Sequence, residues 1–386
     1  MLIDVTRPLG RVMEGWLPTG VDRVSLEYVR HFGTQALALV RYGGRWCILT
    51  ESDSRRIFSE LIDPGPGFRW TIRRSVARAY VGLGGRVLPG QMLFNTGHFG
   101  LDSPDYAGDL RRRGLRPVFF LHDVIPITHP EYCRPGEAER HWQRIETMVT
   151  SGWLIIVNSS DTRAALEVCA NARGWDLPRC VVAPLAAGSL PSAAERPPLA
   201  HPYFVVLGTI EPRKNHLLLL HVWRRLAANL GEKAPRLVII GQRGWECEQV
   251  VDLLDRCEAL RGIVSEESRC SDTALATLLR HARALLFPSF AEGFGIPLVE
   301  ALALGLPVIA SDLPIFHEIA GDIPEYLDPL DGPGWERTIM DYTQESSPSR
   351  IAQKERMAGY RALGWEHHFT VVDEALASLE MTDVHD

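Results

Sequence analysis

The sequence contains no apolar run near the roughly 18 residues that a helix needs to cross a bilayer. Its first residues, Met-Leu-Ile-Asp-Val-Thr, have the pattern of a strand and lack the basic and apolar regions of a secretory leader. The seven scattered cysteines form no Cys-x-x-Cys pair, so a cysteine zinc site is not expected. These absences predict a cytoplasmic chain with reduced thiols.

An excess of basic residues is also missing. The net charge is -7, whereas domains that bind nucleic acids are usually basic, so we expect no nucleic-acid partner. Hydrophobic residues make up 46% of the chain, as in globular proteins. A length of 386 residues exceeds what one ordinary core organises and predicts two domains of similar size.

One segment departs from this acidic average. Residues 68–86 contain five arginines and no acid, and hydrophobic residues lie between the arginines. The arginines are Arg69, Arg73, Arg74, Arg78 and Arg86. One interpretation is a basic amphipathic helix that contacts an anionic membrane at its inner face or attracts an anionic lipid-linked acceptor. The other is a solvated face whose long arginine stems cover apolar surface.

Short apolar runs alternate with helical stretches, which favours an α/β fold with parallel sheets. The strand-like runs are residues 2–5, 36–42, 46–50, 92–95, 117–121, 154–158, 181–184, 203–207, 237–241, 262–264, 284–287, 308–310 and 326–327. A stretch rich in proline and small residues predicts a linker at 191–202. We therefore expect two doubly wound Rossmann-like domains, residues 1–190 and 203–365, and a terminal helix over 366–386.

Two carboxylates, Glu292 and Glu300, lie eight residues apart around a turn that opens a helix. Gly293 and Gly295 allow the backbone to turn after a buried strand, and Pro297 suits a first helical position, where no amide donor is needed. Unpaired amides at a helix N-terminus attract phosphate. The pattern indicates a nucleotide-binding turn with a carboxylate on either side.

A second turn supplies positive charge. Gly208 ends a buried strand, and Arg213 and Lys214 follow at the start of a helix. Basic residues in the first turn of a helix oppose its dipole, so their position indicates an anionic ligand such as a diphosphate.

Two candidates lie in the first half. Thr19 and Gly20 open a helix, either to let the backbone approach a ligand or simply to form a turn. His122 and Asp123 end an apolar strand, a position that often serves a site. The structural alternative is that His122 caps a loop and Asp123 bonds to the backbone.

With these motifs the chain resembles family four of the retaining glycosyltransferases, which have the GT-B fold. The Glu-x7-Glu spacing of residues 292 and 300 and the turn at 208–215 carry the resemblance, which covers most of residues 200–330. It implies two Rossmann-like domains with an interdomain cleft and a terminal helix that crosses back to the first domain. The first half resembles the family more loosely.

The resemblance also implies roles. His122, Asp123, Arg213, Lys214 and Glu292 would be catalytic, with the cations on the diphosphate and Glu292 on the transferred sugar. Glu300 would bind the ribose. The implied donor-binding residues are Gly20, Gly208, Thr209, Arg213, Lys214, Glu292, Gly293, Phe294, Gly295 and Glu300. Thr209 and His317 stand where relatives often have arginine.

The implied reaction moves a hexose, with mannose from GDP-mannose favoured, to a saccharide or lipid-linked saccharide in surface polysaccharide synthesis. No Asp-x-Asp motif of metal-dependent transferases occurs, so we expect neither a metal nor a cofactor besides the nucleoside diphosphate sugar. Glu292 and Glu300 are not a glycosidase pair, because their neighbours are cations and phosphate-binding amides. A nucleotide-sugar epimerase and an inactive nucleotide-binding scaffold remain as alternatives.

Overall fold

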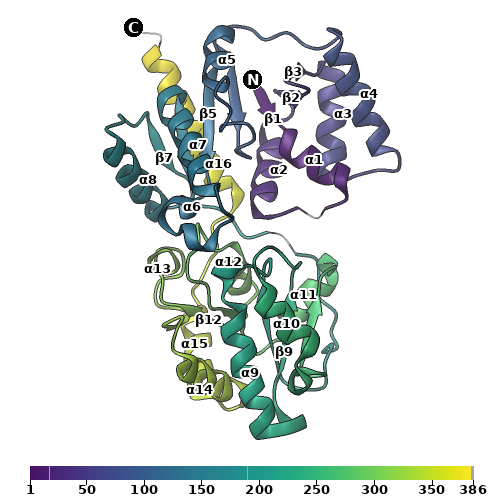
Figure 1. Cartoon of the computed structure of the whole chain (residues 1–386), viewed down its shortest axis with the longest axis vertical. Helices are drawn as coiled ribbons and strands as arrows, with labels where there is room; N and C mark the ends of the chain where they lie inside the picture. Colours follow the sequence, from purple (N-terminus) through teal and green to yellow (C-terminus); the bar gives the residue numbers. More distant parts are fainter. Residues whose placement is uncertain (17, 189, 384–386) are drawn as a thin grey trace. The chain divides into compact units, whose positions relative to one another are not determined.

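The computed structural model describes residues 1–16, 18–188 and 190–383. It divides into two compact units, each with one sheet flanked by helices (Figure 1). Residues 1–127, 138–185 and the segment from Trp365 form the first unit, and residues 128–137 and 186–364 form the second. No helix in the described part of the chain combines the length and the apolar character needed to span a bilayer.

The first unit contains a seven-stranded sheet in the order β3-β2-β1-β4-β5-β6-β7. Its strands are β1 (Leu2–Asp4), β2 (Leu37–Tyr42), β3 (Arg45–Ile48), β4 (Met92–Asn95), β5 (Arg116–Leu121), β6 (Leu154–Val157) and β7 (Cys180–Val182). Its helices are α1 (Thr6–Glu14), α2 (Gly20–Phe32), α3 (Glu51–Ile62), α4 (Phe68–Tyr80), α5 (Tyr106–Arg113), α6 (Ile125–Thr128), α7 (Glu137–Ser151), α8 (Ser160–Arg173) and α16 (Trp365–Asp383), of which α6 ends at the boundary with the second unit.

One strand of this sheet runs against the prediction of a purely parallel sheet. β3 pairs antiparallel with β2, because only Gly43 and Gly44 connect them. Both glycines have positive φ, 55° and 73°, the backbone that a two-residue hairpin turn requires. A parallel connection would need a crossover of a dozen or more residues.

Two helices differ from the expectation. α1 lies between β1 and the glycine turn at Gly20, which the sequence had placed directly after the first strand. The basic helix predicted over residues 68–86 ends at Tyr80, because Gly82 adopts φ 90° and terminates it, which leaves Arg86 in the following loop. Within α4 the apolar face is buried at Ile72 and Val76, and the arginines are exposed.

The second unit contains a six-stranded sheet, all parallel, in the order β10-β9-β8-β11-β12-β13. Its strands are β8 (Tyr203–Leu207), β9 (Arg236–Ile240), β10 (Val264–Glu267), β11 (Leu285–Phe287), β12 (Val308–Ser311) and β13 (Glu325–Leu327). Its helices are α9 (His216–Leu230), α10 (Glu248–Arg256), α11 (Asp272–His281), α12 (Ile296–Ala303), α13 (Pro314–Ala320), α14 (Gly332–Thr343) and α15 (Pro348–Met357), with 3-10 turns η1 (Pro130–Tyr132), η2 (Pro212–Lys214), η3 (Gly231–Lys233) and η4 (Glu258–Leu260).

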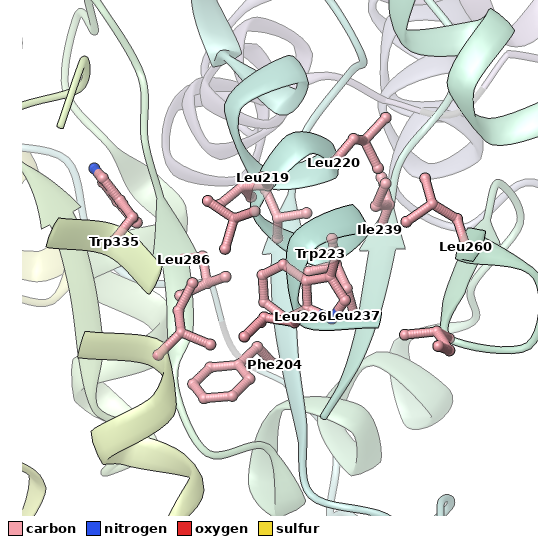
Figure 2. Packing of buried hydrophobic residues seen from close by; sticks show 14 of the residues in the cluster. Phe204, Leu219, Leu220, Trp223, Leu226, Leu237, Ile239, Leu260, Leu286 and Trp335 are labelled. Atoms are coloured by element: carbon pink, nitrogen blue, oxygen red, sulfur yellow. The ribbon is translucent and has the colours of Figure 1, made fainter. Parts of the chain in front are cut away.

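The core of this unit forms where α9 packs on the central strands (Figure 2). Trp223 of α9 is fully buried beside Phe204 of β8, with ring centroids 5.9 Å apart. Its indole Nε1–H donates to the carbonyl of Pro235 at 2.8 Å, so the large side chain is buried without an unpaired donor. Every residue of β8 and β9 is buried, as expected for central strands covered on both faces.

Two segments, residues 128–137 and the terminal helix, belong to the unit that most of their sequence neighbours do not belong to. Residues 128–137 join the second unit, although the sequence placed them in the first domain. There Tyr132 stacks on Phe290 with ring centroids 5.2 Å apart, and the Arg134 guanidinium lies over the Trp245 ring. These contacts join residues that are more than a hundred positions apart, so no local pattern announces them.

The terminal helix α16 groups with the first unit. His368 on this helix lies 3.0 Å from the Tyr28 hydroxyl through Nε2, and its Nδ1 lies 3.1 Å from the carbonyl oxygen of Ala183. Because Nδ1 faces a carbonyl, it carries the proton and donates, and Nε2 accepts from Tyr28. The fully buried ring thus ties α16 to α2 and to the end of β7.

Candidate active site

The candidate site of the second unit lies at a topological switch point of its sheet. From β8 the chain continues to β9 on one side, and from β10 it crosses to β11 on the other. Ligands of doubly wound sheets bind at the carboxyl ends of the two strands where the order reverses. Gly208 follows β8 and Pro288 follows β11, so both predicted turns emerge at this edge.

Glu292 is the centre of the group at this edge. Its Oε2 accepts from Nη1 of Arg213 at 2.8 Å, and its Oε1 lies 2.5 Å from Nζ of Lys214. Ser289 donates its hydroxyl to Oε1 at 2.7 Å. The backbones join as well, since the Phe290 amide donates to the Arg213 carbonyl at 2.8 Å. The two turns therefore form one hydrogen-bonded unit.

The charges in this group are balanced. Arg213 also bonds Glu211, with Nε 2.8 Å from Oε1, so two cations face two carboxylates. Burial by itself raises the pKa of Glu292, but the attraction of Arg213 and Lys214 outweighs it and brings the pKa down to about 2. Burial lowers the pKa of Lys214, and the Glu292 carboxylate opposes that change. Glu292 is therefore ionised and holds both cations.

Glycines allow the strand ends to pack closely at this edge. A Cβ on Gly241, at the end of β9, would lie 2.0 Å from the carbonyl oxygen of Gly208. Gly208 has φ 133°, and the stem of Lys214 lies over it, 3.4 Å from the position of a Cβ. Gly295 has φ 103°, and a Cβ at this position would lie 2.9 Å from the ring of Phe316. Side chains at these positions would separate the turns that carry the charges.

The structure brings some of the predicted residues together and leaves others in supporting positions. Glu292, Arg213 and Lys214 are in direct contact. Gly293, Phe294 and Gly295 form the turn into α12, and Phe294 is buried. Thr209 is half-buried directly after Gly208. Glu300 is buried within α12.

Sequence reasoning missed two members of the group. Ser289 is fully buried and bonds Glu292, and its place three residues before that glutamate in the same turn is the signal that identifies it. His216 is buried directly after the Lys214–Asn215 turn. Within the part of the chain that the structure describes, neither of its ring nitrogens has a hydrogen-bond partner. Burial, and to a smaller extent repulsion from Lys214, lowers the pKa of His216 to about 4.

In the first unit, His122 lies at the carboxyl end of β5. Its Nε2–H donates to the Thr96 carbonyl, which follows β4, at 2.7 Å. Burial lowers the pKa of His122 to about 4, so the ring is neutral near pH 7. The His98 ring lies 5.1 Å away, and its Nε2–H donates to the Phe120 carbonyl at 2.7 Å.

Asp123 takes the structural role that the sequence left open. Its Oδ1 accepts from the backbone amide of Ile125 at 3.0 Å, and its carbonyl accepts from Nε2–H of His141 at 3.0 Å. Within the described residues no hydrogen bond joins the side chains of Asp123 and His122. The carboxylate therefore shapes the turn into α6 and is not positioned to orient the histidine.

Gly20 begins α2 and is exposed. Asp22, two residues later, is buried and forms ion pairs with Arg7 at 3.0 Å and Arg11 at 2.9 Å. Thr19 is the N-cap residue, and Oδ2 of Asp22 accepts from its backbone amide at 2.8 Å and from its hydroxyl at 2.6 Å. The sequence analysis missed these ion pairs, although the Thr-x-x-Asp spacing of a capping box marks Asp22 as a structural residue. The pairs bring two cations of α1 to the N-terminus of α2.

Among the described residues, no group of three or more histidines, cysteines and acids is arranged to hold a metal ion. Two Rossmann-like units with these motifs at the ends of their strands define the class as a GT-B glycosyltransferase. Comparisons with known proteins agree. The family model described as "Glycosyl transferases group 1" matches residues 192–323.

The chain is 30% identical over 269 residues to O-antigen chain mannosyltransferase B of Escherichia coli, an alignment that covers 67% of this chain and 69% of that protein. It therefore belongs to the group 1 glycosyltransferase family. It is also 29% identical over 248 residues to the serotype-specific mannosyltransferase WbdA of Escherichia coli, over 60% of this chain but only 30% of WbdA. The fold matches Anabaena HepE, whose crystal structure contains UDP and glucose, with a TM-score of 0.67, 14% identity and coverage of 98% of this chain and 99% of that one.

Proposed function

We propose that this glycosyltransferase is a retaining, metal-independent mannosyltransferase that uses GDP-mannose and extends a saccharide or lipid-linked saccharide of a surface polysaccharide. The contact of Glu292 with Arg213 and Lys214 at the switch point supports the proposal, because two cations lie beside the carboxylate that we propose binds the sugar. The relatives are named O-antigen chain and serotype-specific mannosyltransferases, which supports mannose and a polysaccharide acceptor.

In the proposed reaction, the bond between the anomeric carbon and the phosphate oxygen breaks, and the acceptor oxygen bonds that carbon on the same face. The departing phosphate takes the proton of the acceptor hydroxyl. Arg213 and Lys214 stabilise the negative charge that builds on the diphosphate, work that a divalent ion performs in other enzymes. Glu292 holds both cations in place and binds hydroxyls of the sugar, and Glu300 binds the ribose.

Thermal unfolding tests the donor directly. A ligand that binds only the folded protein raises the melting temperature, so GDP, UDP, dTDP and ADP are compared, with and without their common sugars. We expect GDP and GDP-mannose to give the largest shifts. A larger shift with another nucleotide would replace the proposed donor, and no shift with any of them would favour the inactive scaffold.

Product analysis tests the reaction. With GDP-mannose and a mannose-ended saccharide acceptor, we expect transfer in EDTA at the same rate as with added Mg²⁺, and a product with the anomeric configuration of the donor. Complete loss of transfer in EDTA would contradict the role of the two cations. A changed nucleotide sugar formed without acceptor would identify an epimerase.

We also propose a peripheral contact between the first unit and an anionic membrane on the cytoplasmic side, through the segment from Arg69 to Arg86. Helix α4 has no acid, and its arginines are exposed. The Trp70 side chain, 75% exposed, lies among them. A purely solvated face does not favour an exposed tryptophan, whereas a membrane interface does. Replacing Arg69, Arg73 and Arg74 by Gln should reduce binding to anionic vesicles, and unchanged binding would remove the idea.

A further inference from the structure

The first unit contains a cavity that the glycosyl-transfer site does not use. It has a volume of about 480 Å³ and lies between the edge strand β3, the loop that follows α4 and the end of α5. Trp46, Ile48, Gly84, Arg86, Arg112 and Arg113 are among the residues that line it. Arg86, which the sequence placed on the basic helix, lies in the loop after α4 and lines this cavity.

The cavity is cationic. Three arginines line it, and no lining residue is acidic. Asp109, outside the lining, pairs with Arg112 at 2.7 Å. The guanidinium of Arg113 lies over the Trp46 ring, 5.1 Å from its centroid, and Arg41 lies 5.6 Å from the same ring. Among the described residues, an acid therefore pairs with Arg112 and with neither of the other two lining arginines.

Two residues that line the cavity also have buried donors without acceptors among the described residues. Nε of Arg113 and Nε1 of Trp46 are both buried, and within the described part of the chain neither has a hydrogen-bond partner. A buried N–H without an acceptor costs about 1–3 kcal/mol, so such groups are usually explained by a water, an ion or a ligand. An anion with several oxygen acceptors would balance the charge of the arginines that line the cavity.

A backbone hydrogen bond and two closely packed glycines fix the wall of the cavity. The amide of Gly85 donates to the carbonyl of Ile48 at 2.9 Å, which attaches the loop to the open edge of β3. A Cβ on Gly84 would lie 2.2 Å from the same carbonyl oxygen, and one on Gly85 would lie 2.7 Å from that of Leu49. Only glycines let the loop approach the strand this closely, and Arg86 follows them into the lining of the cavity.

Large apolar side chains are exposed in the same loop and at the end of α4. Val81 is 69% exposed, Leu83 is 63% exposed and Leu88 is 59% exposed. These residues alternate along the sequence with the lining residues Gly82, Gly84 and Val87. Exposed aliphatic side chains beside a cationic cavity are unfavourable in water but suit a lipid surface, where they enter the headgroup layer.

We propose that this cavity binds the phosphate group of an anionic phospholipid, with Val81, Leu83 and Leu88 in the headgroup layer and Arg86 and Arg113 on the phosphate. The inference deepens the proposed membrane contact and rests on it. It adds a defined lipid site to the general attraction of the α4 arginines. Lipid phosphate and free phosphate share this chemistry, and the exposed aliphatic side chains favour the lipid.

The test is co-sedimentation of the full chain with vesicles of phosphatidylcholine alone and of phosphatidylcholine with phosphatidylglycerol. A basic residue near an anionic surface contributes about 1 kcal/mol, so Arg86→Gln and Arg113→Gln should each weaken binding to the anionic vesicles about fivefold. Leu83→Ser should weaken it as well. Because Leu83 is exposed, this variant keeps the fold even if Arg113→Gln does not.

Arg55→Gln is the matched control, since Arg55 is exposed on α3 and pairs with Glu51. An equal loss of binding in this control would show unspecific charge attraction and overturn the proposal. Full binding by the Arg86 and Leu83 variants would also overturn it. Inorganic phosphate is the second probe: a melting shift with phosphate that Arg86→Gln abolishes, without any change in vesicle binding, would identify a site for free phosphate instead.

The glycosyl-transfer proposal is tested separately in the same proteins. The Arg86 and Leu83 variants should keep the melting shift with GDP-mannose, because neither residue belongs to the donor site. Lost vesicle binding with an unchanged donor shift supports the lipid site. If GDP-mannose does not shift the melting temperature of the wild-type protein, the proposed donor is contradicted and the lipid site is not.

Discussion

Nζ of Lys214 lies 2.5 Å from Oε1 of Glu292, although 78 residues separate the two in sequence. Both side chains are nearly buried, with 10% and 6% of their surfaces exposed. The contact joins the turn after β8 to the turn after β11. It means that the cations proposed to stabilise the leaving group are held by a carboxylate of the same site.

Replacement of Lys214 by Met should lower kcat/KM about 10²- to 10³-fold, because a charge that acts on the leaving group is lost while the stem is retained. Steady-state transfer from the donor measures this. Lys233→Met is the matched control, since Lys233 is exposed, and should leave the rate unchanged. Equal activity of Lys214→Met and the wild type would contradict the site.

Glu292 should make the second unit sensitive to acid. Its folded-state pKa of about 2 lies below the ordinary value of 4.5, so its stabilisation is complete above about pH 4.5 and is lost as the pH falls towards 2. The loss amounts to roughly 3 kcal/mol. Urea unfolding as a function of pH should show a shallower acid decline for Glu292→Gln than for wild type. The exposed control Glu374→Gln should follow wild type, and a Glu292→Gln profile parallel to wild type would contradict the ion pair.

Buried neutral histidines should add a second loss of folding stability, at a higher pH than the loss caused by Glu292. Burial lowers the pKa of His122, His216 and His368 from 6.5 to about 4 in each case. Their contribution is therefore present above the unfolded value and is lost as the pH falls from 6.5 towards 4, at a cost of about 2 kcal/mol each near pH 5. NMR of the imidazole rings should show all three neutral at about pH 5. Protonation of any of these rings at pH 6 would contradict its burial in the folded protein.

Gly241→Ala should destabilise the second unit, because the new Cβ would lie 2.0 Å from the Gly208 carbonyl oxygen and the strand ends would have to separate. Overpacking of this kind costs about 1–3 kcal/mol, which lowers the melting temperature of a unit of this size by several degrees. Gly359→Ala is the control, since no heavy atom lies within 4 Å of its Cβ position. Equal melting temperatures for the two variants would contradict the close packing.

Much of the fold follows from local patterns. Each predicted apolar run overlaps a strand of the structure, because a run of β-branched and aromatic residues between turn formers has few alternatives. The run at 262–264 overlaps β10 only at Val264, since this edge strand continues into the polar residues 265–267. The structure departs from the prediction where glycines with positive φ turn the chain. The Gly43–Gly44 turn reverses β3, and Gly82 ends α4 before Arg86. α1 was missed, because its run from Thr6 to Glu14 begins directly after a strand and includes Pro8 and Gly10.

The sequence was sufficient to identify the residues around each turn, since strand ends, glycines and charges that are neighbours in the chain remain neighbours in space. It could not show which charges meet. Glu292 with Lys214, Asp22 with Arg7, and Arg113 with Trp46 are pairs formed by strand order and helix packing, across 15 to 78 residues. Such contacts depend on distances through space, which the order of strands in a sheet sets and which local residue patterns do not contain.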